Sequence, residues 1–240
     1  MKYALLISGE GGEAPDATGF DTFCERLRAR GAFRGGRRFR GTAVARSVRM
    51  TDGGPVVTSG PTNQDSVQLG AFVVAECDGE EEATALASEF VAASGATVEI
   101  RQVAAPGEGG PDAEKEGVEA SSFGTLPEFA FLMNVEDEKR PWPGSRAFDE
   151  LMENCGKVLT HLQERGRFRG TERLVPSTAA KTIRPASGMP RVLDGPFSEA
   201  REVIGGFILG ECDGIDEAAR LAALLPGAAS GSVEVREVLR

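Results

Sequence analysis

Apolar residues recur along this chain at two different spacings, and each spacing indicates a different element of secondary structure. Unbroken apolar runs at residues 3–7 and 129–133 predict buried strands. Behind each run, apolar residues are spaced by three and four positions, which predicts a helix with one buried face. The two stripes consist of Phe20, Phe23, Cys24 and Leu27, and of Phe148, Leu151, Met152, Cys155, Leu159 and Leu162.

The remainder of each segment follows the same plan. Gly31 and Gly166 are suited to end the two helices. Asp78 and Asp213 stand where an aspartate would cap a second helix. Further strands are expected near residues 42–48, 67–76, 179–183 and 203–211.

The last strand of each segment alternates between apolar and charged residues. In the first segment, Val98 and Ile100 fall on one face, and Glu99 and Arg101 fall on the other. This pattern predicts one buried face and one exposed face. The order strand, helix, strands, helix, strand is a ferredoxin-like α+β plan, with helices on one face of an antiparallel sheet. Two such sheets could bury their bare faces against each other.

The two segments repeat one another at a fixed spacing of 135 residues. The matching blocks are RGAFRG and RGRFRG at 30 and 165, GP at 60 and 195, GAF and GGF at 70 and 205, ECDG at 76 and 211, and VEIR and VEVR at 98 and 233. One offset held across all of these blocks indicates a tandem duplication of a single domain.

Residues 105–126 separate the two copies and differ from both in composition. They begin APGEGGP and continue as an acidic run, which cannot support a core, so we expect a flexible linker. The chain has a net charge of -10, and this segment holds five acidic residues and one basic residue. A nucleic-acid binder usually has a basic surface, so a nucleic-acid partner is not expected.

Composition also bears on location and on metal binding. No stretch approaches the ~18 apolar residues that a membrane span needs, and the first apolar run is too short for a signal peptide. We therefore expect a cytoplasmic protein with no membrane partner. The four cysteines, Cys24, Cys77, Cys155 and Cys212, include no CxxC pair. That spacing argues against a zinc site and predicts buried, reduced thiols.

The second copy carries residues typical of a known family. It contains DGPF at residues 194–197, the glycine pair of GGF at 205–207, and VEVR at 233–236. Together with the opening MKYALL, these residues resemble the YCII-related family, in the branch named for its DGPF motif. The resemblance divides the chain into a YCII-like domain with a degenerate motif at 1–104, the acidic Gly/Pro linker at 105–126, and a YCII-like domain with the intact motif at 127–240.

The resemblance implies an α+β fold of the dimeric α/β-barrel superfamily, with two tandem ferredoxin-like domains packed sheet to sheet within one chain. It implies an uncharacterised protein that binds or transforms a small molecule in a cleft between the domains, either as a monomeric pseudo-dimer or as a homodimer. Some relatives occur beside sigma-factor-like transcription proteins, so the alternative is a non-catalytic interaction module associated with transcription. Whether the chain is an enzyme stays open, and no cofactor or metal is expected.

The first copy departs from the family pattern. Residues 59–62 read SGPT, so the aspartate and phenylalanine of the motif are both replaced. A site that depends on the motif should therefore exist once per chain. Catalysis in the wider family is attributed to a His and an Asp. The single histidine, His161, falls about 220° from the apolar stripe of its predicted helix, so it should face solvent.

Asp194 is the candidate catalytic residue. A carboxylate on the cleft side of a sheet would have its pKa raised by desolvation and could act as a general base. An Asp-Gly-Pro run is equally typical of turns, in which the aspartate caps the backbone and the glycine takes a positive φ. Both interpretations stay open.

Arginine, aromatic and acidic residues supply the other candidates. The candidate ligand-binding residues are Arg184, Glu211, Phe197 and Arg236. Arg101 and Arg236 recur at the same spacing, and an ion pair with Glu99 and Glu234 is favoured over an anionic ligand. Residues 26–49 contain nine arginines, for which a solvated face paired with glutamates is favoured over a nucleic-acid patch.

Overall fold

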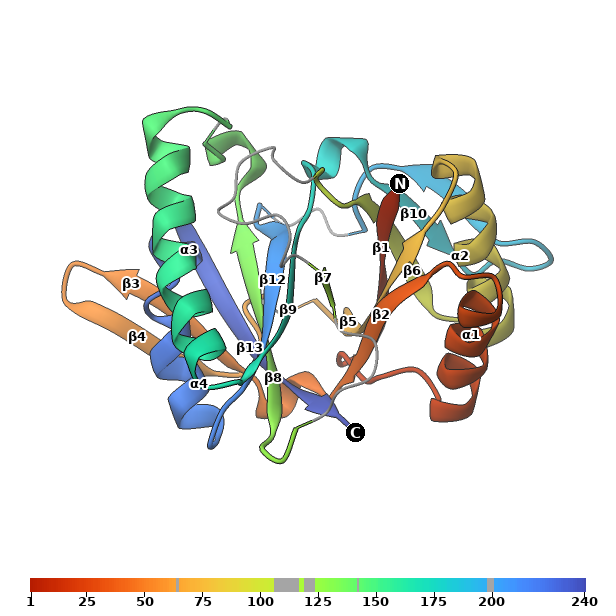
Figure 1. Cartoon of the computed structure of the whole chain (residues 1–240). Helices are drawn as coiled ribbons and strands as arrows, with labels where there is room; N and C mark the ends of the chain where they lie inside the picture. Colours follow the sequence, from red (N-terminus) through yellow and green to blue (C-terminus); the bar gives the residue numbers. More distant parts are fainter. Residues whose placement is uncertain (64, 106–116, 119–123, 142, 198–200) are drawn as a thin grey trace.

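The computed structural model describes residues 1–63, 65–105, 117–118, 124–141, 143–197 and 201–240. These residues form an α+β structure in which antiparallel strands join into one 13-stranded sheet. The sheet folds into two facing layers, and the helices lie on the outer side of each layer (Figure 1).

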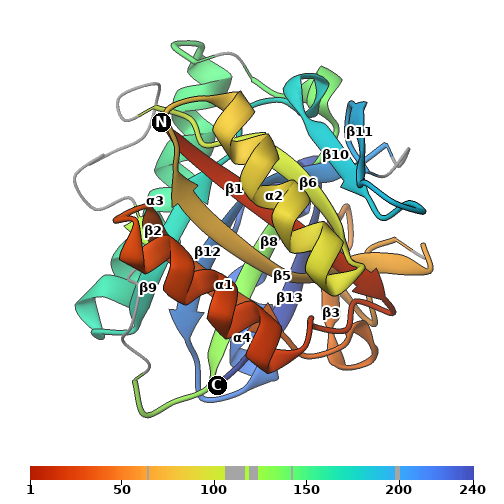
Figure 2. The ribbon, with the colours of Figure 1, turned by 90° about the vertical axis from the view of Figure 1, so that its right-hand side faces the viewer.

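The first half of the chain builds the first layer and its helices. Strands β6, β1, β5 and β2 lie side by side in that order, and α1 and α2 cover their outer face (Figure 2). The elements are β1 (Lys2–Glu10), α1 (Ala17–Ala29), β2 (Phe33–Phe39), η1 (Thr42–Val44), β3 (Arg46–Thr51), β4 (Gly54–Ser59), β5 (Val67–Glu76), α2 (Glu80–Ser94) and β6 (Thr97–Gln102).

The second half builds the second layer in the same order, with β13, β8, β12 and β9 side by side. Most of the expected linker lies outside the described residues, but 117–118 form β7, which pairs with β9. The elements are β7 (Gly117–Val118), β8 (Glu128–Val135), η3 (Asp137–Lys139), α3 (Arg146–Glu164), β9 (Phe168–Arg173), η4 (Ser177–Ala179), β10 (Lys181–Arg184), β11 (Arg191–Asp194), β12 (Val203–Glu211), α4 (Ile215–Ala222), α5 (Gly227–Ser230) and β13 (Gly231–Leu239).

The strand registers of the two layers match at a separation of 135 residues. Arg37 lies opposite Phe72 where β2 meets β5, and Glu172 lies opposite Phe207 where β9 meets β12. For β1 and β8 the spacing is 126, because Lys2 and the first residue of β8 lie opposite residues 76 and 211. Residues at the same place in the two layers are called counterparts below.

Each layer is completed by a hairpin from the other half of the chain. The β3–β4 hairpin of the first half pairs through β3 with β13, and the β10–β11 hairpin of the second half pairs through β10 with β6. Short pairings of β2 with β13, and of Val103 with Leu174, join the layers at their edges. Backbone hydrogen bonds therefore cross between the halves at several places.

Apolar side chains form a core under the helices of each layer and a third core between the layers. In this third core, the rings of the counterparts Phe72 and Phe207 pack with centroids 4.5 Å apart. Burying each ring stabilises the fold by about 1.5–3 kcal/mol. The members of this core are Ala4, Leu6, Phe39, Leu69, Phe72, Val74, Val103, Ala130, Leu132, Leu174, Phe207, Leu209 and Val238.

Two buried ion pairs join the halves with opposite polarity. The Arg37 Nε of β2 donates to Glu128 Oε1 of β8 at 2.7 Å, and neither side chain is more than 3% exposed. The Lys2 Nζ of β1 lies 2.9 Å from the buried carboxylate of Glu172 in β9. Arg37 and Glu172 are counterparts, and so are Lys2 and Glu128. Two first halves would therefore bring like charges together, and so would two second halves, whereas unlike halves bring opposite charges together.

The structure confirms the predicted central strands at 67–76 and 203–211 and corrects others. No strand was predicted at β2 or β9, because arginine and glycine disguise their alternation. In β2 every second residue is buried, and Arg37 occupies one of these inward positions. The strands expected at 42–48 and 179–183 are partly the 3-10 turns η1 and η4, with β3 and β10 beginning later.

The helices follow the prediction with corrected starts. Gly79 and Gly214, rather than the aspartates before them, occupy the cap positions of α2 and α4, and no side chain caps either helix. The Asp78 N–H instead donates to Glu82 Oε2 at 2.8 Å. The backbone of the aspartate is thus used in this contact, rather than its carboxylate.

The arginine-rich segment pairs with glutamates, as the sequence predicts. The pairs are Arg26–Glu89, Arg34–Glu76, Arg37–Glu128, Arg40–Glu237 and Arg49–Glu202. The predicted solvated face is wrong for Arg37, because β2 turns this side chain into the space between the layers.

The cysteines are free and buried, which confirms the expected reduced thiols. Desolvation raises the pKa of Cys24, Cys155 and Cys212 to about 12 and that of Cys77 to about 11. Within the part of the chain that the structure describes, no helix has both the length and the apolar character needed to cross a membrane.

Reversing one buried charge should destabilise the protein, and reversing its partner as well should restore stability. Arg37→Glu places two carboxylates in contact in a buried site, so we expect the free energy of unfolding to fall by about 3–5 kcal/mol. Glu128→Arg alone should cost a similar amount, and the double variant should recover most of the loss. Urea denaturation of the four proteins measures the coupling energy.

The exposed Arg34–Glu76 pair provides the matched control, because reversal of its charges should change stability far less. Additive losses in the Arg37→Glu, Glu128→Arg double variant would contradict the pairing described above.

The folded protein should react very slowly with Ellman's reagent at pH 8. A thiol with a pKa of about 12 is almost entirely protonated at this pH, and the thiolate is the reactive form. After unfolding in guanidinium chloride, four thiols per chain should react. Fast, stoichiometric reaction of a thiol before unfolding would show that the helix layers open readily.

Candidate functional site

The two Gly-Pro turns have the same backbone conformation. Gly195 has a φ of 96° and Gly60 a φ of 97°, in the region that glycine adopts without steric cost. The Gly195 N–H donates to the Ala180 carbonyl at 2.8 Å, and the Gly60 N–H donates to its counterpart, the Ala45 carbonyl, at 3.0 Å. The intact motif and the degenerate motif therefore form one kind of turn.

Each turn reaches the last strand of the other half. The Phe197 N–H, from the second half, donates to Glu99 Oε2 of β6 at 2.8 Å. The Thr62 N–H, from the first half, donates to Glu234 Oε2 of β13 at 2.9 Å. Because the donor is the backbone, the contact survives the change from phenylalanine to threonine.

Two buried arginines hold the same glutamates from the opposite side. Arg101 Nη1 donates to Glu99 Oε1 at 3.0 Å, and Arg236 Nη1 donates to Glu234 Oε1 at 3.2 Å. The predicted ion pairs are therefore confirmed. The predicted exposed face is wrong, because Arg101 is 0% and Arg236 is 1% exposed. The facing layer and the exchanged hairpins cover this side of the strands.

Arg236 supports Glu234 rather than facing a ligand. Its guanidinium donates five hydrogen bonds, one to Glu234 and the others to the carbonyls of Gly12, Arg40 and Leu69. Burial lowers the pKa of Arg236, and the nearby charge of Glu234 opposes that shift. All five donors of the fork are thus used within the protein.

A pocket of about 90 Å³ lies between the two layers, and we name it the junction pocket. Both halves line it with Leu6, Ser8, Asn63, Asp65, Val67, Gln68, Leu69, Glu99, Leu132, Asn134, Pro196, Phe197, Glu202, Val203, Ile204 and Glu234. Four of these described residues are acidic and none is lysine or arginine. Since a water molecule takes about 30 Å³ in the liquid, the pocket accommodates a few waters or one small ligand group.

The junction pocket is built to accept hydrogen bonds. Each glutamate has one oxygen held by an arginine and the other by a backbone N–H. A carboxylate offers about four lone-pair sites, so Glu99 and Glu234 keep accepting capacity toward the pocket. Asn134 adds an amide group, and its counterpart is Ser8. A carboxylate held this way can also take a proton from a bound donor.

Asp194 is not among the residues that line the junction pocket. Its side chain is 92% exposed and lies 2.8 Å from Lys181 Nζ. The hydrogen bond from Lys181 lowers the pKa of Asp194, whereas the predicted general base needs a raised pKa. The expectation of a desolvated carboxylate is therefore wrong, because Asp194 stays on the solvent side of the β10–β11 hairpin.

The remaining predicted residues lie in different places. Phe197 lines the junction pocket. Arg184 covers its ring from outside, with the guanidinium 5.0 Å from the ring centroid, and donates to the Phe197 carbonyl at 3.1 Å. Glu211 is buried at the far end of β12 from Val203 and pairs with Arg169 at 3.1 Å. Phe197 is therefore the predicted residue that contacts the pocket directly.

Sequence reasoning missed Glu99, Glu234 and Asn134 as pocket residues. The signal was the recurring block at residues 98–101 and 233–236, which places two charged side chains on one face of the last strand in both copies. Alternation alone assigns that face to solvent, because it cannot show that a second layer covers the strand.

His161 does not meet Asp194. It lies on α3, outside the second layer, with its Nδ1 3.1 Å from Arg165 Nη1, whereas Asp194 belongs to a hairpin of the first layer. Among the residues that the structure describes, no group of three or more His, Cys, Asp or Glu side chains is placed to hold a metal ion.

Comparison with known proteins identifies the family. A family model described as the YCII-related domain matches residues 129–240. An uncharacterised protein of Rhizobium meliloti (strain 1021) is 40% identical over 106 residues, which is 43% of this chain and 84% of that protein.

A search of solved structures returns a mutant chlorite dismutase from Candidatus Nitrospira defluvii, crystallised in complex with cyanide. It is similar to 100% of this chain over 90% of its own, with a TM-score of 0.39 and 10% sequence identity. The family assignment rests on the family model and on the Rhizobium relative: the chain belongs to the YCII-related family.

Proposed function

We propose that the chain is a tandem pair of ferredoxin-like domains that form, within one polypeptide, the sheet-to-sheet arrangement of a dimeric α/β barrel. The equal strand order of the two layers and the fixed register spacing of 135 residues support this proposal. The exchanged hairpins support it further, because each half needs the other to complete its sheet. A single chain would then contain a complete site and act as a monomer.

The proposed function is the binding, and where a proton can be taken the transformation, of a small hydrogen-bond-donating molecule in the junction pocket. The observation that supports it is the pair of buried glutamates, one from each half, each held by a backbone N–H from the other half. An amine or a hydroxyl group suits such a pocket, because ionised carboxylates only accept hydrogen bonds. Glu99 and Glu234 would also be the candidate general bases.

The two ends of the junction pocket differ, and this difference would orient the ligand. Phe197 lines the pocket on one side, whereas its counterpart Thr62 uses its N–H on Glu234 and its hydroxyl on Ser47. Asn134 likewise faces its counterpart Ser8. We propose that Phe197 and Asn134 set the ligand's orientation, so that the site is used in one direction.

The other predicted residues would then have supporting roles. Arg184 shields the Phe197 ring, and Arg236 fixes Glu234. Asp194 joins Lys181 at the end of the β10–β11 hairpin and would maintain the turn rather than take part in catalysis. Free cysteines suit a reducing compartment, so we place the protein in the cytoplasm.

The second candidate function is a non-catalytic interaction module associated with transcription. One observation favours it, which is that apolar side chains fill most of the space between the layers and leave a pocket of about 90 Å³. The experiment on the glutamates separates the two candidates, because a pure interaction module would not need their charges for a small ligand.

Glu234→Gln should abolish the thermal shift that a small ligand produces. A panel of small amines and amino alcohols is screened by differential scanning fluorimetry on the wild-type protein. A ligand at about 100 times its Kd stabilises the folded state by about 2.7 kcal/mol, which is a clear rise in Tm. We expect this rise to be lost in Glu234→Gln, because the variant removes the charge that holds the ligand.

Asn134→Ser is the second variant, since it introduces the residue of the counterpart position and leaves the ion pairs intact. It should weaken the same ligand without unfolding the protein. Asp194→Asn is the matched control and should keep the full shift, because the side chain is 92% exposed. Loss of the shift in Asp194→Asn together with its retention in Glu234→Gln would refute the proposed site.

A further inference from the structure

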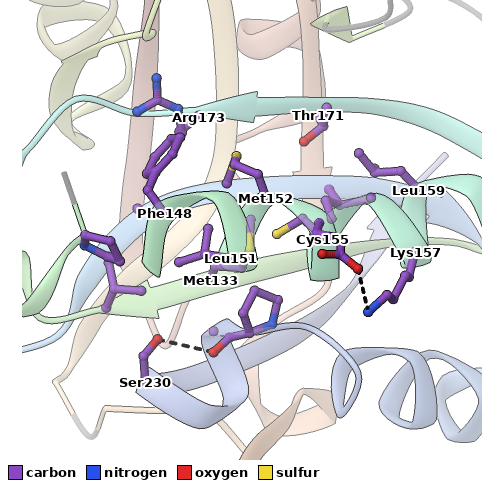
Figure 3. Close-up of a pocket in the computed structure, with 18 of the residues that line it drawn as sticks. Met133, Phe148, Leu151, Met152, Cys155, Lys157, Leu159, Thr171, Arg173 and Ser230 are labelled. Carbon is purple, nitrogen blue, oxygen red and sulfur yellow. Dashed lines mark hydrogen bonds and ion pairs between the residues drawn. The ribbon is translucent and has the colours of Figure 1, made fainter. Parts of the chain in front are cut away.

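A cavity of about 980 Å³ lies between α3 and the outer face of the second layer (Figure 3), and we name it the α3 cavity. Its apolar lining includes Met133, Phe148, Leu151, Met152, Cys155 and Leu159. It shares no lining residue with the junction pocket. The two spaces lie on opposite faces of β8, because successive side chains of a strand point to opposite sides.

The α3 cavity exists because the second half lacks rings that fill the same space in the first half. In the first half, a Cβ placed on Gly36 would lie only 3.4 Å from Phe20 Cζ, so the Phe20 ring reaches the sheet. The counterparts Cys155 and Thr171 both line the cavity. Two further rings of the first core, Phe23 and Phe90, pack 4.9 Å apart. The counterparts of these two rings are Val158 and Leu225.

The longer helix of the second half extends the apolar wall instead of closing the space. α3 has 19 residues, whereas α1 has 13. The additional turns carry Phe148 and Leu151 along the cavity. Protein cores contain few voids larger than a water molecule, and ligand sites have volumes of about 300–1,000 Å³. The size of this space is therefore typical of a ligand site rather than of a packing defect.

Two arginines lie at one end of the α3 cavity. The Arg173 guanidinium lies 5.4 Å from the centroid of the Phe148 ring, and Figure 3 shows it above that ring. Arg140 also lines the cavity and donates to the carbonyls of Leu174 and Gly205 at 2.9 Å each. Burial lowers the pKa of Arg140, and the nearby charge of Arg173 acts in the same direction. An anion at this end would relieve the repulsion between the two cations.

Acidic groups also line the cavity, but most of them are paired. Glu136 lies 2.8 Å from Lys139, and Glu153 lies 3.4 Å from Lys157. The Glu172 carboxylate pairs with Lys2 on the other side of the sheet. The carboxylates therefore leave the cationic end of the cavity available to a negatively charged group.

We propose that the α3 cavity binds an apolar small molecule that carries one anionic group, such as a medium-chain or aryl carboxylate. The chain or ring of the ligand fills the space that Phe20 fills in the first half. Its anionic group lies between Arg140 and Arg173. This site is independent of the proposed function in the junction pocket.

Isothermal titration of the full-length protein with decanoate tests the proposal. Decanol and decyltrimethylammonium are the matched ligands, because they keep the chain and remove or invert the charge. We expect decanoate to bind more tightly than decanol, and decyltrimethylammonium to bind most weakly. Glu234→Gln should leave the decanoate affinity unchanged, which distinguishes this site from the junction pocket.

Cys155→Phe restores the ring of the first half and should weaken decanoate by about tenfold or more, which is at least about 1.4 kcal/mol. Leu159→Phe is a second filling variant, and circular dichroism shows whether each variant is folded. Cys155→Ser keeps the space and should retain binding. Arg173→Leu should weaken decanoate but not decanol.

Tight decanoate binding that both filling variants leave unchanged would overturn the site. Equal affinities for decanoate, decanol and decyltrimethylammonium would overturn the anionic class. Absence of binding by decanoate and decanol in the wild-type protein would overturn the whole proposal.

Discussion

The exchange of hairpins between the two halves is the constraint on which the rest of this structure depends. Antiparallel hydrogen bonds place β3 against β13 and β10 against β6. The turns that follow these hairpins then carry their backbone donors to Glu99 and Glu234. Without the exchange, the two glutamates would lie on uncovered sheet faces, and the junction pocket would not close.

Buried charges of inverted polarity give this exchange its direction. Desolvation offsets much of the attraction within a buried ion pair, so such a pair adds little net stability over apolar residues. The Arg37–Glu128 and Lys2–Glu172 pairs matter more for what they oppose. Like halves would bury like charges, and that cost favours the association of unlike halves. An asymmetric site follows from the same preference.

The two halves have diverged on both faces of their sheets. On the inner face the difference is polar, since Asn134 replaces Ser8 and Phe197 replaces Thr62 as their counterparts. On the outer face it is a difference of volume, since Cys155 replaces Phe20. The first half is packed with aromatic rings, and the second half encloses a large cavity.

The sequence by itself determined the repeat, the helices, the central strands, the buried thiols and the Glu–Arg pairs, because each leaves a periodic or spaced pattern in the chain. It missed β2, β9 and the burial of Arg101 and Arg236, and it placed Asp194 in a cleft. These features were decided by tertiary structure. Local alternation shows that a strand has two kinds of face, but only the second layer and the exchanged hairpins determine which charged face is removed from water.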